Sequence, residues 1–237
     1  MVQRGRGINQ MPLPDKDVTF FMQISHEGDY AVHSANRLRQ LYQGSRIILR
    51  SDGKGLFNFD PHIIDVEFYD EEPLFAVENG GAAIHRMFEI YFSKPPSRYL
   101  IKIDPDTLFH RKLSSLPKGT EIFGTIQELD GCRSIQGGFI GFPSVAARKI
   151  YRSALLLSPE LTMPRASDGA FMGIMQRRAV RVGLSSFDWS IGWAAEALGI
   201  GLFNFPEVHS TWKDPPTNPN GKFAVTHPDP NRPFTSR

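Results

Sequence analysis

Two apolar segments on either side of one amphipathic segment limit the folds that this chain can adopt. Residues 18–25 are mostly apolar and rich in β-branched and aromatic side chains, which is typical of a buried parallel strand. In residues 29–42 the apolar positions recur at steps of three and four, which predicts a helix with Asp29 as N-cap and Gly44 just past its end. Residues 46–50 predict a second short strand, which a Ser-Asp-Gly turn ends. Strand, helix and strand in this order form a βαβ unit.

The same alternation continues along the chain. Residues 78–92 predict a helix and residues 99–103 a strand, and further helices are predicted to begin near Pro143, Asp168 and Asp188. With no internal repeat and no flexible linker, residues 18–212 are predicted to form one Rossmann-like α/β domain with a mixed, mostly parallel sheet flanked by helices. Residues 1–17 are an N-terminal extension. The proline-rich residues 213–237 are expected to be an extended tail with little regular structure that closes over the active site.

Composition excludes some classes of protein. The chain has 237 residues, enough to bury a core without disulfides, and its 27 basic and 25 acidic residues give a net charge of only +2. These charges are scattered, so they predict no nucleic-acid partner. The one cysteine, Cys132, has no partner for an internal disulfide, which fits a reducing compartment. There is no signal-peptide-like apolar run and no stretch of 18 apolar residues, so we expect a cytoplasmic protein with no transmembrane segment.

The strongest functional pattern is Asp104-Pro105-Asp106, directly after the apolar residues 99–103. Two carboxylates at the carboxyl edge of a strand can hold one hard divalent cation such as Mg²⁺ or Mn²⁺, for which a bound diphosphate would supply further oxygen ligands. The proline biases Asp104 toward an extended conformation, which helps to present both side chains to one cleft. A capping turn is the alternative interpretation, because Asp and Pro are common turn residues.

With this motif the chain resembles the GT-A superfamily of glycosyltransferases, which carry an Asp-any-Asp motif after an apolar strand. Five segments occur in the superfamily's order and together span about residues 18–193. They are the first strand ending at Gln23-Ile-Ser25, the second strand running into Arg50-Ser-Asp52, Asp104-Pro-Asp106, the pair Gly137-Gly138, and residues 168–173. The resemblance implies a metal-dependent transfer of a sugar from a UDP- or GDP-linked donor to a hydroxyl of a glycan or glycoconjugate, with Mn²⁺ or Mg²⁺ as cofactor.

The resemblance also implies roles for residues on the donor side. Asp104 is expected to contact the ribose or the metal, and Asp106 to ligate the metal that holds the donor diphosphate. Asp52 matches a position that often contacts the nucleoside, although a plain Ser-Asp-Gly turn explains it equally well. Ser25 and His26 would lie beside the base or ribose if ligands bind at the carboxyl ends of the strands. His26 is equally explained as a solvated loop residue.

Other candidates lie further along the chain. Gly137 and Gly138 would let the backbone approach the donor or acceptor sugar closely, and their alternative is a bulge or turn. Asp168 matches an acidic position that binds the acceptor hydroxyl or acts as the base, and its alternative is an N-cap. Asp188 competes for that role because two nearby tryptophans are suited to packing on sugar rings, although core packing also explains them.

The tail supplies one further candidate ligand. Several members of the superfamily return a C-terminal histidine to the metal site, and His227 fits because it follows a short strand-like segment and precedes Pro228. Imidazole is a reasonable ligand for Mn²⁺ beside two carboxylates. A disordered tail histidine is the alternative, and His209 and Asp229 are weaker substitutes.

Three other functions remain open at this point. A haloacid-dehalogenase-like phosphatase also uses an aspartate pair after a strand, but its motif has a residue between the second Asp and the Thr and usually lies near the N-terminus. A nucleotidyltransferase would need a glycine-rich basic loop, whereas Gly5 and Gly7 precede the first strand. A domain that binds a sugar nucleotide or glycan without turning it over is the third alternative. The donor sugar, the acceptor and the stereochemical outcome do not follow from the sequence.

Overall fold

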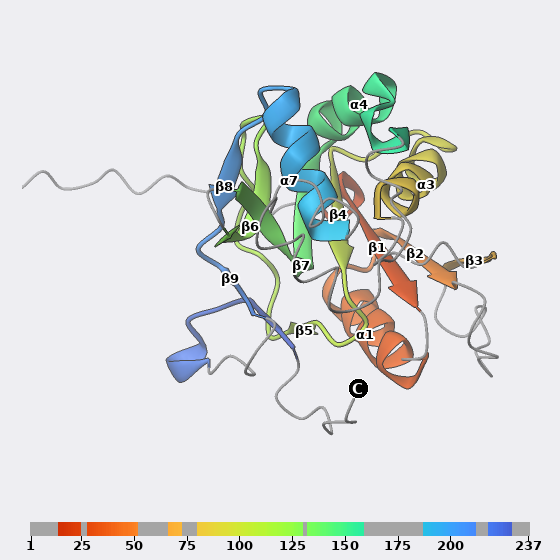
Figure 1. The fold of residues 1–237 in the computed structure, drawn as a ribbon. Helices are drawn as coiled ribbons and strands as arrows, with labels where there is room; N and C mark the ends of the chain where they lie inside the picture. The colour runs from red at the N-terminus through yellow and green to blue at the C-terminus, as the bar shows by residue number, and fades with distance from the viewer. Residues whose placement is uncertain are drawn as a thin grey trace, which may run out of the picture.

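The structure, a computed structural model, describes residues 14–24, 28–51, 66–72, 80–129, 132–158, 187–211 and 218–228. In this part of the chain a seven-stranded sheet and a three-stranded sheet pack with helices (Figure 1). The large sheet contains β1 (Val18–Ile24), β2 (Arg46–Ser51), β3 (Glu67–Asp70), β4 (Tyr99–Ile103), β6 (Ile122–Leu129), β7 (Cys132–Pro143) and β8 (Leu202–Asn204). The small sheet contains β5 (Leu108–Phe109), β9 (Val208–Ser210) and β10 (Val225–His227). The helices are α1 (Gly28–Leu41), α3 (Gly80–Phe92), α4 (Ser144–Ser153) and α7 (Phe187–Ala197), with short 3₁₀ turns at Asp15–Asp17, Leu155–Leu157 and Pro219–Gly221.

The strand order of the large sheet shows where a ligand is expected, which is at the carboxyl ends of β1 and β4. The order is β3-β2-β1-β4-β7-β6-β8, and only β7 runs antiparallel to its neighbours. The mixed, mostly parallel α/β sheet that the sequence predicts is therefore confirmed. The chain adds β2 and β3 on one side of β1 and then places β4 on the other side, which makes the boundary between β1 and β4 a topological switch point. Ligands of such sheets bind beyond the carboxyl ends of the strands at this point, and Asp104 directly follows β4.

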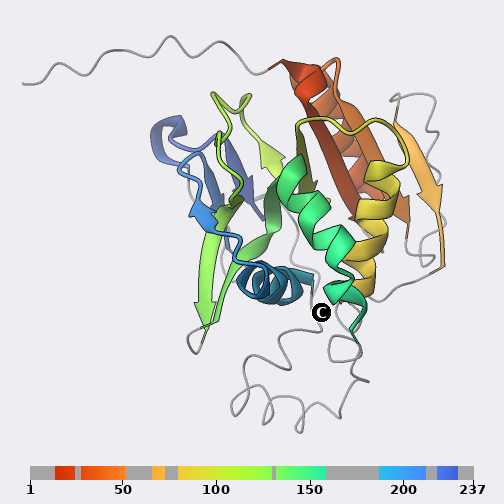
Figure 2. The same cartoon turned by 90° about the horizontal axis from the view of Figure 1, so that it is seen from above.

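The core has two layers because successive side chains of a strand point to opposite faces of the sheet. Phe20 and Met22 of β1 pack with α1 and the small sheet, whereas Phe21 packs with α3, α4 and α7. Figure 2 shows these three helices together on one face. Burial of β1 on both faces explains its nearly continuous apolar sequence, because neither face meets solvent.

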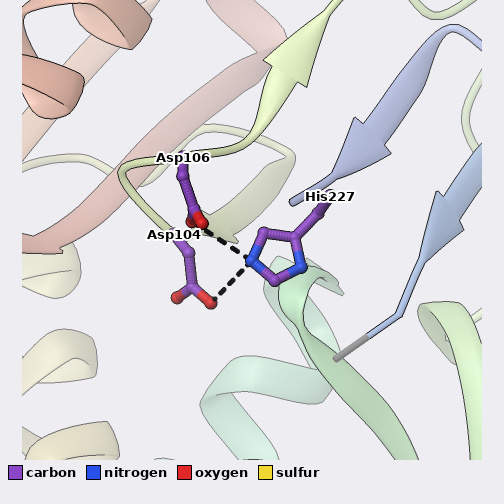
Figure 3. A group of neighbouring side chains, drawn as sticks. All are labelled: Asp104, Asp106 and His227. Carbon is purple, nitrogen blue, oxygen red and sulfur yellow. Dashed lines mark ion pairs between the residues drawn. The ribbon is translucent and has the colours of Figure 1, made fainter. Parts of the chain in front are cut away.

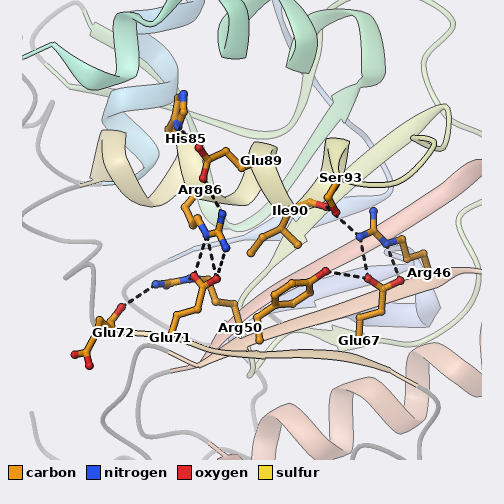
Figure 4. Close-up of polar contacts among 11 residues, drawn as sticks. Arg46, Arg50, Glu67, Glu71, Glu72, His85, Arg86, Glu89, Ile90 and Ser93 are labelled. Carbon is orange, nitrogen blue, oxygen red and sulfur yellow. Dashed lines mark hydrogen bonds and ion pairs between the residues drawn. The ribbon is translucent and has the colours of Figure 1, made fainter.

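Ion pairs attach the edge strand β3 to the rest of the sheet (Figure 4). Arg46 of β2 holds Glu67 of β3 with two hydrogen bonds of 2.9 and 2.8 Å. Arg50, which is 1% exposed, donates from Nε to Glu71 at 2.8 Å, and Arg86 of α3 contacts the same carboxylate. Glu71 therefore joins β2, the end of β3 and α3.

Three local features differ from the sequence-based expectations or refine them. Asp29 is not the N-cap, because α1 already begins at Gly28 and Asp29 lies in its first turn, where a carboxylate interacts favourably with the helix dipole. The tail contains β10, although little regular structure was expected there, because residues 225–227 pair with β5 and β9. Residues 78 and 79, which we expected to begin the second helix, lie outside the described residues. No described helix is long and apolar enough to cross a membrane.

Candidate metal centre

The Asp-Pro-Asp motif forms a tight turn between β4 and β5. The Asp104 amide donates to the Gly138 carbonyl at 3.3 Å, and the Thr107 amide donates to the Asp104 carbonyl at 3.1 Å. From α1, the Ser34 hydroxyl donates to the Pro105 carbonyl at 2.6 Å. The turn that we expected as the alternative interpretation is therefore present. Because β7 holds this backbone on one side and α1 on the other, the points from which the two carboxylates extend are fixed.

The two carboxylates of this turn meet a histidine from the small sheet (Figure 3). His227 ends β10, and its Nε2 lies 3.4 Å from Asp104 Oδ2 and 3.2 Å from Asp106 Oδ1. The candidate ligand atoms of the three residues all lie within 4.8 Å of one another. The structure thus brings together the three residues that the sequence marks as metal ligands, although 120 residues separate Asp106 from His227.

Burial and charge differ within this cluster. Asp106 is 4% exposed and His227 8%, whereas the Asp104 side chain is 34% exposed, so the cluster opens on the side of Asp104. The buried Lys102 side chain forms an ion pair with Asp104 Oδ1 and donates to the Gly137 carbonyl at 2.7 Å. Lys102 therefore holds one oxygen of Asp104 and leaves Oδ2 directed toward His227.

Asp188 lies beside the cluster but does not belong to it. It is in the first turn of α7, and its Oδ2 accepts hydrogen bonds from the Gly137 amide at 2.9 Å and from Gln127 Nε2 at 3.4 Å. Burial raises the pKa of this carboxyl group, and the negative charge of Asp104 raises it further, while Lys102 opposes the shift. An ionised Asp188 is consequently a stronger base than an ordinary aspartate.

Gly137 and Gly138 lie in an irregular part of β7. Gly124 of β6 pairs with Ile140, but Ile126 pairs with Ile135, so residues 136–139 of β7 face only residue 125 of β6. This arrangement is a bulge, which was one of the two interpretations of the glycine pair. Such irregularities often redirect groups next to functional sites, and here the Gly138 carbonyl accepts hydrogen bonds from the motif turn.

The two glycines also make room for neighbouring side chains. A Cβ atom on Gly137 would lie 2.9 Å from Asp188 Cγ, and one on Gly138 would overlap the His227 ring and lie 2.6 Å from Ser210 Oγ. The space that a side chain would need at these positions is thus already filled by candidate functional residues. Close approach to a bound sugar, which the resemblance implies, stays a prediction.

The remaining candidates are not part of the cluster. Ser25, His26, Asp52, Asp168 and Asp229 lie outside the described residues. His209 lies on β9 with its ring 4.9 Å from the ring of Phe223, and it is not one of the three clustered residues.

Sequence reasoning missed three residues that contact the cluster or its neighbours. Lys102 gave a usable signal, because a charged residue in an apolar strand two positions before Asp104 is expected on the same face of the sheet. Gln136 and Ser210 gave none, since the contact of Ser210 with Gln136 joins segments far apart in the sequence, and its contact with His227 depends on the pairing of β9 with β10.

The donor atoms of the cluster fit a hard divalent cation. Two carboxylate oxygens and one imidazole nitrogen converge, and Mn²⁺ accepts this combination while leaving coordination positions for other oxygen ligands.

Comparison of the sequence with models of known protein families finds no match, and comparison with curated protein sequences finds none either.

Proposed function

We propose that the chain is a metal-dependent glycosyltransferase that moves a sugar from a nucleotide-diphosphate sugar, UDP- or GDP-linked, to a hydroxyl of a glycan or glycoconjugate acceptor. The observation that carries this proposal is the convergence of Asp104, Asp106 and His227 at the carboxyl end of β4. These residues would hold Mn²⁺ or Mg²⁺ at the switch point of the sheet, where α/β proteins of this type bind nucleotides.

Charge supports a divalent cation together with an anionic substrate. With a neutral imidazole, the ligand set carries the charge of two carboxylates, which one divalent cation balances. Two unit charges about 4 Å apart interact by about 4 kcal/mol at an effective dielectric constant near 20. A diphosphate that approached without a cation would meet repulsion of this order from Asp106, whereas the ion pair with Lys102 offsets part of the charge of Asp104. Donor binding is therefore expected to require the metal.

The chemistry divides between the cation and the residues of the chain. When bound, the cation neutralises charge that develops on the diphosphate leaving group. Asp104, Asp106 and His227 bind it, and Lys102 orients Asp104 through its ion pair. An inverting reaction also needs a base within hydrogen-bond reach of the acceptor hydroxyl. Among the described residues Asp188 is the candidate for that base, and Asp168 is the candidate outside them.

The test combines a ligand panel with matched variants. Thermal unfolding is measured with UDP-, GDP-, CMP- and dTDP-linked sugars, each with and without Mn²⁺, because a ligand that binds only the native state raises its stability. A stabilisation that needs both Mn²⁺ and one nucleotide is expected. Asp106→Asn should abolish this stabilisation and donor hydrolysis. Asp70→Asn is the control, because Asp70 also ends a strand of the sheet but is exposed.

Other results would favour other functions. Full metal-dependent donor binding and turnover by Asp106→Asn would contradict the assignment of the metal site. Release of phosphate from simple monoesters, with no response to any nucleotide sugar, would favour the phosphatase. Metal-dependent binding of a nucleotide sugar without hydrolysis or transfer would favour a binding domain.

A further inference from the structure

The imidazole of His227 has a second nitrogen, which faces away from the carboxylates. His227 Nδ1 lies 3.1 Å from Ser210 Oγ, and the two residues are register partners on the neighbouring strands β10 and β9. Ser210 is 3% exposed and His227 8%. At this depth each polar hydrogen needs a protein acceptor, because a buried polar group without a hydrogen-bond partner destabilises the fold.

The direction of the hydrogen bonds follows from Gln136. The Gly138 amide donates at 2.9 Å to Gln136 Oε1, which identifies that side-chain atom as the amide oxygen. An amide oxygen only accepts, so the Ser210 hydroxyl hydrogen must be directed to the same oxygen. Ser210 Oγ then has only lone pairs to offer to His227.

The protonation of the His227 ring is thereby fixed on one nitrogen. Since Ser210 Oγ can only accept, Nδ1 must carry the hydrogen and donate it. In a neutral ring the other nitrogen, Nε2, then has a free lone pair, and this atom faces Asp104 and Asp106. An unprotonated ring nitrogen of a neutral imidazole is the form of histidine that ligates a metal.

We propose that Ser210 and Gln136 are positioning residues of the metal centre, which hold His227 in the Nδ1–H tautomer and direct its Nε2 to the cation. This inference rests on the proposed function. The bulge of β7 makes the arrangement possible, because it brings the Gln136 side chain and the Gly138 amide to the same place. Groups that orient metal-ligating histidines in this way typically contribute 10–100-fold to metal affinity.

The experiment measures Mn²⁺ affinity directly, from the electron paramagnetic resonance signal of free Mn²⁺ during titration of the purified protein. Ser210→Ala removes the acceptor and should weaken Mn²⁺ binding about 10–100-fold. Ser210→Thr keeps the hydroxyl and should retain most of the affinity. Gln136→Met frees the Ser210 hydroxyl to donate to Nδ1 and should weaken binding, whereas Gln136→Glu preserves the acceptor oxygen and should weaken it less.

Ser45→Ala is the matched control for loss of a buried serine hydroxyl. Ser45 is 4% exposed and donates to the Asp15 carbonyl at 2.8 Å, so this variant should lose stability but keep wild-type Mn²⁺ affinity. Melting of each metal-free variant shows whether it is folded. A folded Ser210→Ala protein with wild-type affinity would overturn the positioning role alone. Wild-type protein that does not bind Mn²⁺ would overturn both the role and the proposed metal site.

Discussion

Replacement of Gly138 by alanine tests whether the packing of β7 sets the geometry of the candidate metal centre. A Cβ atom at this position would overlap ring atoms of His227 and would lie 2.6 Å from Ser210 Oγ. The backbone of Gly138 is not free to retreat, since its carbonyl accepts hydrogen bonds from the Asp104 amide at 3.3 Å and the Thr107 hydroxyl at 2.7 Å. The His227 ring is therefore the group that must move.

Displacement of the His227 ring should lower both the folding free energy and the affinity for Mn²⁺. Insertion of a methyl group into a filled space typically costs about 1–3 kcal/mol of folding free energy. Metal–ligand distances tolerate only about 0.2 Å of change, so a shifted imidazole no longer coordinates well. We expect Mn²⁺ affinity to fall about 10–100-fold, which is the effect of losing a group that orients a metal ligand. Such a fall corresponds to about 1.4–2.7 kcal/mol of binding free energy.

The assay compares Gly138→Ala with Gly141→Ala on the same strand. A Cβ atom on Gly141 would overlap the ring of Phe123 in the core, away from the three candidate ligands. Chemical denaturation without metal should show that both variants are destabilised, whereas calorimetric titration with Mn²⁺ should show a loss of affinity only for Gly138→Ala. A folded Gly138→Ala protein with wild-type affinity, or an equal loss in Gly141→Ala, would refute the reasoning.

Four further predictions concern the stability of the metal-free protein. Hydrogen bonds from Arg86 and then from Arg50 outweigh burial and hold the pKa of Glu71 below its ordinary 4.5, so its contribution is present above that pH and is lost as the pH falls through the lowered value. Denaturant titrations from pH 3 to 7 should therefore show a weaker acid dependence for Glu71→Gln. Burial raises the pKa of Asp188 above its ordinary 3.8. The free energy of unfolding of the wild type, compared with that of Asp188→Asn in the same denaturant titrations, should therefore fall as the pH rises from 3.8 through the raised pKa. Burial raises the pKa of Tyr42 from 10.0 to about 12, so stability should fall between these values in alkali. Tyr42→Phe, which leaves the buried Leu113 amide without its acceptor at 2.8 Å, should cost about 1–3 kcal/mol at neutral pH by the same titration.

The parts of the fold that were predictable from sequence are those encoded by local patterns. The run at residues 99–103 has the bounds of β4, and the amphipathic pattern before Gly44 corresponds to α1. In both cases the side chains that define the element are also those that pack in the core. Asp104 and Asp106 could be placed at the carboxyl end of β4 because they directly follow its apolar residues, and this is the end at which ligands of such sheets bind.

Long-range pairing explains what the sequence did not predict. The tail was expected to have little regular structure because of its many prolines, and the short strand-like segment before His227 did not show which strands it would meet. The structure pairs β10 with β5 and β9. His227 became a candidate ligand through the family resemblance, supported locally by the short strand-like segment before it and by Pro228 after it. The bulge of β7 and the contacts of Ser210 and Gln136 likewise depend on partners far away in the sequence.

The geometry of the centre depends on backbone pairing between the two sheets as much as on its side chains. The motif turn carries the chain directly from β4 of the large sheet to β5 of the small sheet, so both carboxylates lie at the junction. Pairing of Thr226 with Leu108 then fixes β10 relative to this turn. Because side chains alternate along a strand, a slip of β10 by one residue would turn His227 to the opposite face. The distance between the imidazole and the carboxylates is therefore set by strand register, and the candidate metal centre depends on the pairing of the small sheet.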